Sequence, residues 1–343
     1  MLAAPDKFRG TATAAEVAEV VARAAAAAGW ACDRAPVADG GEGTLEALLP
    51  AQGAARAASG GTVRHTTVRG PLGDPVTAEW GLRGDLAVVE MARASGLALV
   101  GGAEGNDPLR ASTAGTGELI AAAVDAGARK VIVGVGGSAS TDGGLAALTA
   151  LSPGRRLRGV EVVVACDVTT RFVDAAEVFA PQKGATPAQV SLLRRRLERL
   201  AQVYVRDYGI DVRPIPGSGA AGGLAGGLAA AGAALVPGFD VVADALGLAE
   251  RIAAADLVVT GEGLLDAESF EGKAVGGVLE LAAEAGVPVL VVAGEVYDDE
   301  LPAELDDSVE VVSLTARFGA ERARDDVAGC VRDVVAGRLA NGL

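Results

Sequence analysis

The feature that most constrains the fold of this chain is a strand-like run followed by glycines and hydroxyl residues and then by a helix. Residues 130–144 read KVIVGVGGSASTDGG. The Val/Ile-rich start predicts a buried parallel strand, and residues 145–151 predict the start of a helix. Glycines let a backbone approach a ligand closely, and the amides at a helix start favour an anion. A tight turn without a ligand fits the same pattern, but similar loops recur along the chain, which favours ligand-binding loops.

Composition narrows the classes of function. The 343 residues predict two domains, and the net charge of −15 argues against a nucleic-acid or membrane surface. Three scattered cysteines predict neither a disulfide framework nor a zinc site, which fits a cytoplasmic protein. Residues 217–239 are uncharged and long enough to span a bilayer, but they are nearly all Gly and Ala. We expect a loop and a tightly packed helix there.

The chain has a single histidine, His65, in the strand-like segment TVRHTTVRG. A multi-histidine metal site is excluded, and a Ser-His-Asp triad would need this one residue. We expect His65 on a sheet surface. The chemistry then depends on Asp, Glu, Lys and Arg side chains and on backbone amides.

Charged residues follow the first two predicted strands. Residues 1–4 predict a strand that leads to Asp6, Lys7 and Arg9, and residues 11–28 predict a helix with Thr13 and Glu16 as a capping box. Residues 31–37 predict a second strand, followed by the loop ADGGEGT and a helix from residue 45. Ligands of open α/β sheets bind at the carboxyl ends of strands. A solvated loop and a capped helix start are the alternatives.

In the middle of the chain, the predicted pattern of alternating strands and helices is interrupted by a hairpin. Residues 66–83 predict an antiparallel hairpin and the beginning of a second domain. A strand over 86–91, a helix over 119–126 and a clean buried strand over 160–166 follow. Asp167 comes directly after the last of these, a place suited to a general base or a magnesium ligand, although a capping role fits as well. Residues 192–202 predict a basic, solvated helix.

Two glycine-rich segments near the end match nucleotide motifs only in part. PGSGAAGG contains GxGxxG, but Pro214 and Pro216 make a poor preceding strand, so we interpret it as another phosphate or sugar loop. Lys273 follows Gly272 as in a Walker A loop, but Ala267 and Ala274 break that motif. Lys273 at a helix start still suits a phosphate. We expect strands over 257–259 and 287–292, an edge strand over 309–314, and helices over 275–285 and 325–339.

Ten motifs resemble one family in their order along the chain. They are APDKFRGTATAAEVAE, ADGGEGT, RGPLGDPVTAEWG, EMARASGLALV, STAGTGELI, VGGSASTDGG, ACDV, FAPQKGAT, PGSGAAGGL and VTGEGLLDAESFEGK. Over nearly its whole length the chain thus resembles the type I glycerate kinases. The resemblance implies ATP-dependent phosphorylation of D-glycerate to 2-phosphoglycerate with Mg²⁺, in a cytoplasmic monomer or homodimer.

The resemblance also implies an architecture. It is an α/β fold of two domains with mainly parallel sheets, one a discontinuous Rossmann-like domain (1–62 plus 237–343) and one an inserted α/β domain with an antiparallel hairpin (63–236). The active site is expected between them.

Some positions depart from the family pattern. Lys7 and Arg9 stand for Ser and Lys, Thr170 and Arg171 interrupt a usual Asn-Pro, and Glu268-Ser269 stand for Gln-Thr. These departures leave open a 3-phosphoglycerate product or another small hydroxy acid. An NAD(P)-dependent oxidoreductase and a non-catalytic protein that binds a nucleotide or sugar acid are the rival functions.

Direct phosphoryl transfer needs positioning and charge neutralisation more than covalent chemistry. We assign Asp167 as the base, with Lys273 and Arg9 as further catalytic residues. The expected substrate-binding residues are Asp6, Asp39, Glu42, Thr44, Ser95 and Asp266. The expected nucleotide- or phosphate-binding residues are Gly136, Gly137, Ser138, Thr141, Asp142, Lys183, Gly217, Ser218, Gly219 and Gly222. No metal ligands are assigned.

Overall fold

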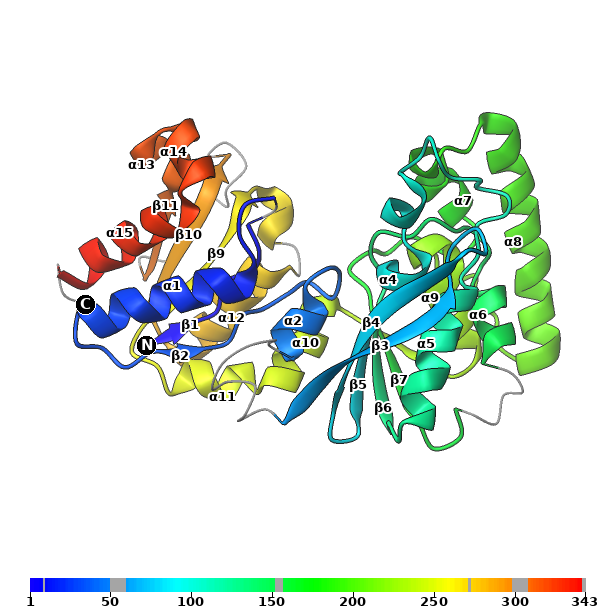
Figure 1. Cartoon of the computed structure of the whole chain (residues 1–343), viewed down its shortest axis with the longest axis horizontal. Helices are drawn as coiled ribbons and strands as arrows, with labels where there is room; N and C mark the ends of the chain where they lie inside the picture. The colour runs from blue at the N-terminus through cyan, green and yellow to red at the C-terminus, as the bar shows by residue number, and fades with distance from the viewer. Residues whose placement is uncertain (9, 50–59, 152–156, 271–272, 298–307, 341–343) are drawn as a thin grey trace. The chain divides into compact units, whose positions relative to one another are not determined.

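The computed structural model describes residues 1–8, 10–49, 60–151, 157–270, 273–297 and 308–340. The chain divides into two compact units (Figure 1). Unit 1 comprises Met1–Asp39, Glu46–Leu48 and Val242–Leu343, and unit 2 comprises Gly40–Leu45 and Leu49–Val241. Each unit contains a mainly parallel sheet covered by helices, so the predicted α/β class is confirmed. The predicted domain bounds and the placement of the active site between the domains stay predictions.

Unit 1 is built on a five-stranded sheet in which every neighbouring pair is parallel. Its order is β11-β10-β9-β1-β2, from the strands β1 Leu2–Ala3, β2 Asp33–Arg34, β9 Val258–Leu265, β10 Val289–Val296 and β11 Val309–Ser313. From β1 the chain crosses to β2 on one side, while β9 lies on the other side. The strand order therefore reverses between β1 and β9, and such a switch point opens a ligand crevice at the carboxyl ends of the strands.

Alternating side chains build the core of unit 1. Ala3, Val259 and Val292 pack with Val17 and Val331 of the helices α1 (Ala14–Ala27) and α15 (Val327–Ala340). Because neighbouring residues of a strand point to opposite faces, Val258 and Val291 face the other way. The helix α12 (Ala274–Ala285) covers that second face (Figure 1). The predicted capping box of α1 is confirmed, with Glu16 N donating to Thr13 Oγ1 over 3.2 Å.

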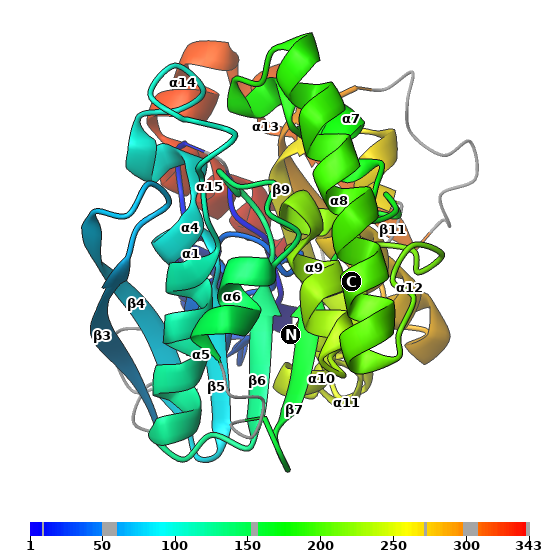
Figure 2. The ribbon, with the colours of Figure 1, turned by 90° about the vertical axis from the view of Figure 1, so that its right-hand side faces the viewer.

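Unit 2 contains a six-stranded sheet in sequential order, β3 to β8. The strands β3 (Gly61–Arg69) and β4 (Pro75–Arg83) form the predicted antiparallel hairpin, and β5 (Leu86–Glu90), β6 (Lys130–Gly134), β7 (Glu161–Ala165) and β8 (Ala234–Val236) are parallel. The helices α5 (Ala114–Asp125) and α6 (Leu145–Ala150) lie over β5–β7 (Figure 2). His65 is exposed on β3, as predicted.

Smaller elements complete the two units. They are α2 (Thr44–Leu48), α4 (Ala92–Ser95), η1 (Leu97–Val100), α7 (Ala175–Phe179), η2 (Pro181–Lys183), α8 (Pro187–Tyr208), α9 (Ala220–Ala230), α10 (Gly238–Leu246), α11 (Leu248–Ala253), η3 (Ala267–Phe270), α13 (Leu314–Phe318) and α14 (Ala320–Asp325). Every residue of α9 is buried, as expected for a tightly packed helix. Within the described ranges, no helix is long and apolar enough to cross a membrane.

Some predicted bounds were wrong. The strand expected over 31–37 is only Asp33–Arg34, and the basic helix extends from Pro187 to Tyr208, since Thr186 and Gln189 form a capping box. The acidic TGEG segment, expected to follow its strand, lies inside β9 because β10 pairs with it as far as Leu265. Gly261 permits this pairing, since a Cβ there would lie 1.8 Å from the Val292 carbonyl oxygen. The short strand β8, hidden in a Gly/Ala-rich stretch, was not predicted.

Candidate functional site

A polar pocket of about 610 Å³ lies in unit 1, at the switch point between β1 and β9. It collects several side chains that the sequence analysis assigned to the site, namely Asp6, Asp39, Asp266 and Lys273. The other charged residues of its lining are Lys7, Glu262, Glu268, Glu295 and Arg324. The pocket thus holds cations and carboxylates side by side, which suits a ligand that carries both negative charge and hydrogen-bond donors.

Lys7 lies between two carboxylates. Its Nζ is 3.6 Å from Asp6 Oδ1 and 3.6 Å from Asp39 Oδ1, and its backbone amide donates to Asp6 Oδ1 over 2.7 Å. Asp6 is only 7% exposed, and burial raises its pKa to about 6 against the lowering effect of Lys7. The sequence analysis placed Lys7 with Asp6 and Arg9 at a strand end where ligands bind, but it did not include Lys7 among the assigned site residues. Its position at the carboxyl end of the first strand was the available signal.

Glu262 is a further pocket residue that sequence reasoning missed. It lies in β9, and its Oε1 is buried without a hydrogen-bond partner among the described residues. Burial raises the pKa of Glu262 to about 7; Asp6 and Asp266 also raise it, while Ser269 and Lys273 lower it. The signal was present in the TGEG motif, but we interpreted that motif as a loop.

The opposite wall of the pocket is organised by η3 and the start of α12. Asp266 Oδ1 accepts from Ser269 N over 3.1 Å, and this bond closes the turn of η3. Lys273 stands at the N-cap of α12 and donates from Nζ to Glu268 Oε2 over 2.7 Å. Arg9, the third predicted catalytic residue, lies outside the described residues.

The glycine-rich loop after β6 forms a second polar centre, in unit 2. Lys183 is 3% exposed and donates from Nζ to Ser138 Oγ over 2.6 Å and to the Ser140 carbonyl over 2.7 Å. Burial lowers the pKa of Lys183 to about 7, while the nearby Asp142 raises it. The structure thus brings together the predicted phosphate-binding residues Lys183 and Ser138, which are 45 positions apart in sequence.

Several side chains hold the same loop in place by hydrogen bonds. Asn106 Nδ2 donates to the Ala139 carbonyl over 3.0 Å, and Asp142 accepts from the Thr113 amide over 2.9 Å. Burial raises the pKa of Asp142, while the hydrogen bonds from Thr113 lower it. Asn106 Oδ1, Ser140 Oγ and Thr141 Oγ1 are buried without a partner among the described residues, so this centre still has acceptor and donor groups to offer. Gly136 and Gly137 begin the loop, with Gly137 at φ +67°.

The predicted loop at 217–222 packs against the loop after β6. Gly143 N donates to the Gly222 carbonyl over 3.0 Å, and a Cβ on Gly222 would lie 2.0 Å from the Ser140 carbonyl oxygen. A Cβ on Gly219 would lie 2.4 Å from the Arg171 carbonyl oxygen, and Ser218 is buried and donates to the Ile215 carbonyl. These residues therefore serve close backbone packing, and Gly217, at φ +79°, begins the same segment.

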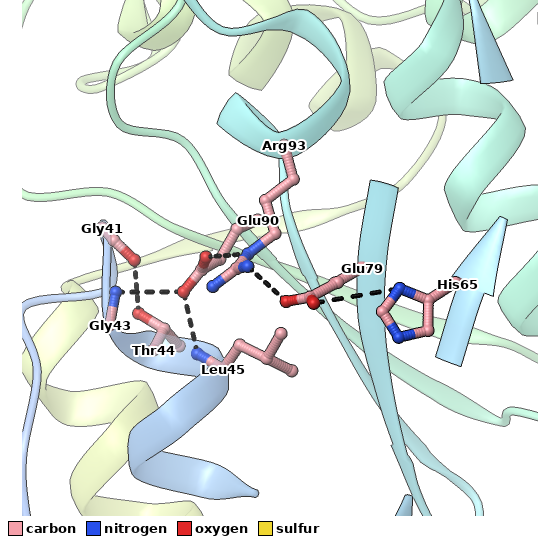
Figure 3. A network of polar contacts seen from close by, with 8 residues as sticks. All are labelled: Gly41, Gly43, Thr44, Leu45, His65, Glu79, Glu90 and Arg93. Atoms are coloured by element: carbon pink, nitrogen blue, oxygen red, sulfur yellow. Dashed lines mark hydrogen bonds and ion pairs between the residues drawn. The ribbon is translucent and has the colours of Figure 1, made fainter. Parts of the chain in front are cut away.

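A partly buried network of hydrogen bonds and ion pairs holds the ADGGEGT loop (Figure 3). Glu90 Oε1 accepts from the backbone amides of Gly43 and Leu45 over 3.0 and 2.9 Å, and Glu90 Oε2 accepts from Arg93 Nε over 2.6 Å. Arg93 also donates to Glu79 over 2.6 Å, and Glu79 Oε1 lies 3.8 Å from His65 Nδ1. Glu90 and Arg93 were not predicted, because a sequence does not show that a strand end will meet a distant loop.

The remaining predicted site residues differ in exposure. Thr44 is buried and donates to the Gly41 carbonyl over 2.8 Å, and Ser95 is buried with its Oγ 2.8 Å from Thr116 Oγ1. Glu42 and Asp167 are exposed, and Asp167 Oδ1 accepts from Gly238 N over 2.6 Å at the first residue of α10.

The structure offers carboxylates for Mg²⁺ but no complete cage. Within the described ranges, no three His, Cys, Asp or Glu residues are grouped closely enough to hold a metal ion. Mg²⁺ commonly takes one or two carboxylates and fills its other positions with water and substrate phosphates. The carboxylates of Asp6 and Asp39 fit that limited donor set.

The fold and the pocket define a class: an α/β protein with mainly parallel sheets and a pocket lined by acidic and basic side chains at a strand switch point. A family model described as the glycerate kinase family matches residues 1–154 and 152–334. The glycerate 2-kinase of Escherichia coli (strain K12) is 39% identical over 332 residues, covering 86% of this chain and 85% of the relative. The glycerate kinase of Bacillus subtilis (strain 168) is 38% identical over 335 residues, covering 87% and 86%.

A crystal structure from Salmonella typhimurium LT2, assigned as glycerate kinase 2, superposes with a TM-score of 0.83 at 36% identity, over 99% of this chain and 98% of that one. The chain belongs to the glycerate kinase family, as its motifs indicated.

Proposed function

We propose that this enzyme phosphorylates D-glycerate with ATP and releases 2-phosphoglycerate. Family membership supports the reaction, and the relative from Escherichia coli is named a glycerate 2-kinase. The observation that carries the proposal to this chain is the pocket at the β1/β9 switch point, where Lys7 and Lys273 lie among carboxylates. Lysines suit the carboxylate of glycerate and the transferred phosphate, and carboxylates suit its two hydroxyls.

The two polar centres support a division of roles. Asp6, Asp39 and Asp266, with Lys7 and Lys273, line a pocket of a size that accepts a small acid. The Lys183 centre suits the phosphates of ATP, because an ammonium and hydroxyl groups converge there. Thr44 and Ser95 are buried, so we propose that they position the loops around them.

Direct transfer needs a group that accepts the proton of the attacking hydroxyl. We propose Asp167, an exposed carboxylate at the carboxyl end of β7, for this role. Mg²⁺, when bound with ATP, would neutralise phosphate charge, and Asp6 and Asp39 are the carboxylates we propose to hold it. Arg9 keeps its predicted role of neutralising charge.

Among the rival functions, an oxidoreductase finds little support. The GxGxxG segment is explained by packing, since Gly219 and Gly222 have no room for a side chain. Cytoplasmic location and a monomeric or homodimeric state remain predictions.

The test is ATP consumption with D-glycerate and Mg²⁺, with the product read by enolase in the presence and absence of phosphoglycerate mutase. A signal with enolase alone identifies 2-phosphoglycerate. A signal that needs the mutase identifies 3-phosphoglycerate and overturns the proposed regiochemistry. If no ATP is consumed, D-glycerate is not the substrate, and other small hydroxy acids become the next candidates.

A further inference from the structure

Glu262 carries an acceptor that nothing in the described structure satisfies. Its Oε1 is buried and without a hydrogen-bond partner, although the residue lines the pocket at the switch point. A buried carboxylate oxygen that lacks a donor is costly, so native structures usually supply one from the protein, from water or from a ligand. A donor from a ligand would remove this cost in the bound state.

The surrounding charges restrict the kind of ligand. Lys7 and Lys273 offer positive charge for an anionic group, and Lys7 lies within 3.6 Å of both Asp6 and Asp39. A carboxylate at neutral pH offers only oxygens that accept hydrogen bonds, so it has nothing to donate to Glu262. A hydroxyl can donate. A molecule with a carboxylate for the lysines and a hydroxyl for Glu262 satisfies both kinds of group.

We propose that Glu262 accepts a hydrogen bond from a hydroxyl of the substrate and thereby selects hydroxy acids. This inference rests on the proposed function, since it names the residue that recognises the substrate hydroxyl in the same pocket. The role is one of binding specificity and is separate from that of the base. Glu262 was not among the site residues expected from the sequence.

Charged and polar groups from several segments act on Glu262. They are Asp6 after β1, Asp266 and Ser269 at η3, and Lys273 at the N-cap of α12. Glu295 lines the same pocket from β10.

The experiment compares dissociation constants of D-glycerate with those of two analogues that each lack one hydroxyl, lactate (D-isomer) and 3-hydroxypropionate. Calorimetry without ATP measures binding to the wild type, Glu262→Met and Glu262→Asp. The wild type should bind D-glycerate about 10–100-fold more tightly than the analogue that lacks the recognised hydroxyl, and Glu262→Met, which removes both carboxylate oxygens, should reduce this gap to a few-fold. Glu284→Met, an exposed change on α12, should keep the wild-type gap.

An unchanged gap between D-glycerate and both analogues in a folded Glu262→Met enzyme would overturn the inference. If Glu262→Met does not fold, Glu262→Asp gives the same test, because it keeps the charge but withdraws the oxygen. Should the wild type bind D-glycerate without consuming ATP, the proposed kinase activity fails, while the selectivity of Glu262 is still measured by binding.

Discussion

The almost completely buried side-chain ammonium of Lys183, at the end of η2, donates to the hydroxyl of Ser138 in the loop after β6 over 2.6 Å. A buried ammonium must recover its lost hydration through hydrogen bonds. Lys183 makes these hydrogen bonds to Ser138 and Ser140 of the glycine-rich loop after β6. The effect of burial on the Lys183 pKa can be detected by measuring the free energy of unfolding as a function of pH.

We expect the stability of the wild type to rise, relative to Lys183→Met, between pH 7 and about pH 10. The folded pKa is about 7 and the ordinary value is 10.5, so the unfolded chain binds the extra proton in this window. The free energy of unfolding should therefore gain up to about 1.4 kcal/mol per pH unit relative to the variant. Urea denaturation at pH 7, 8 and 9 measures the difference. Lys130→Met, an exposed change, should run parallel to the wild type, and a parallel course for Lys183→Met would contradict a lowered pKa.

Replacing Glu90 should lower the free energy of unfolding of unit 2, and the loss should be larger when the substitution removes both carboxylate oxygens. Glu90→Ala leaves the amides of Gly43 and Leu45 and the guanidinium of Arg93 without their acceptor, and we expect a loss of about 2–4 kcal/mol. Glu90→Gln keeps one acceptor oxygen and should lose less. Thermal and urea unfolding measure both, with Glu79→Gln, 39% exposed, as a control that should cost at most about 1 kcal/mol. Equal losses for Glu90→Ala and Glu90→Gln would show that the two amides do not depend on Glu90.

The two glycines Gly222 and Gly232 offer a matched pair for testing close packing. Both have positive φ, +66° and +98°, but a Cβ lies 2.0 Å from the Ser140 carbonyl oxygen at Gly222 and meets nothing within 4 Å at Gly232. Gly232→Ala should cost about 1 kcal/mol from the backbone alone, whereas Gly222→Ala should cost about 2–5 kcal/mol. Denaturant unfolding measures both, and similar losses would mean that the loop after β6 moves aside easily.

Asp167→Asn tests the proposed base without removing its structural contact. An asparagine oxygen can still accept from Gly238 N, the 2.6 Å hydrogen bond of the wild type, so the fold should persist. We expect kcat to fall by about 10²–10⁴. Steady-state kinetics with ATP and D-glycerate, alongside the exposed control Asp240→Asn, give the measurement. Turnover like that of the wild type in Asp167→Asn would remove Asp167 from the role.

Local sequence patterns were enough to predict the α/β class, the hairpin, most helices and the family. These features depend on period-2 and period-3.6 hydrophobicity, capping boxes such as Thr13–Glu16, and collinear motifs. Four charged residues of the pocket, Asp6, Asp39, Asp266 and Lys273, were also expected. The three aspartates follow predicted parallel strands, whose carboxyl ends share one edge of a sheet.

Which of these residues share a site, and which support the fold, depends on tertiary contacts. Burial and partner choice depend on segments far apart in sequence, as when Glu90 binds the amide of Leu45 or when Gly222 meets Ser140. Glu262 shows the same dependence: it lies in β9 where that strand pairs with β10, and its Oε1 is buried without a hydrogen-bond partner among the described residues. A sequence shows which groups are available, but desolvation and hydrogen bonding are set by the three-dimensional neighbours of each group.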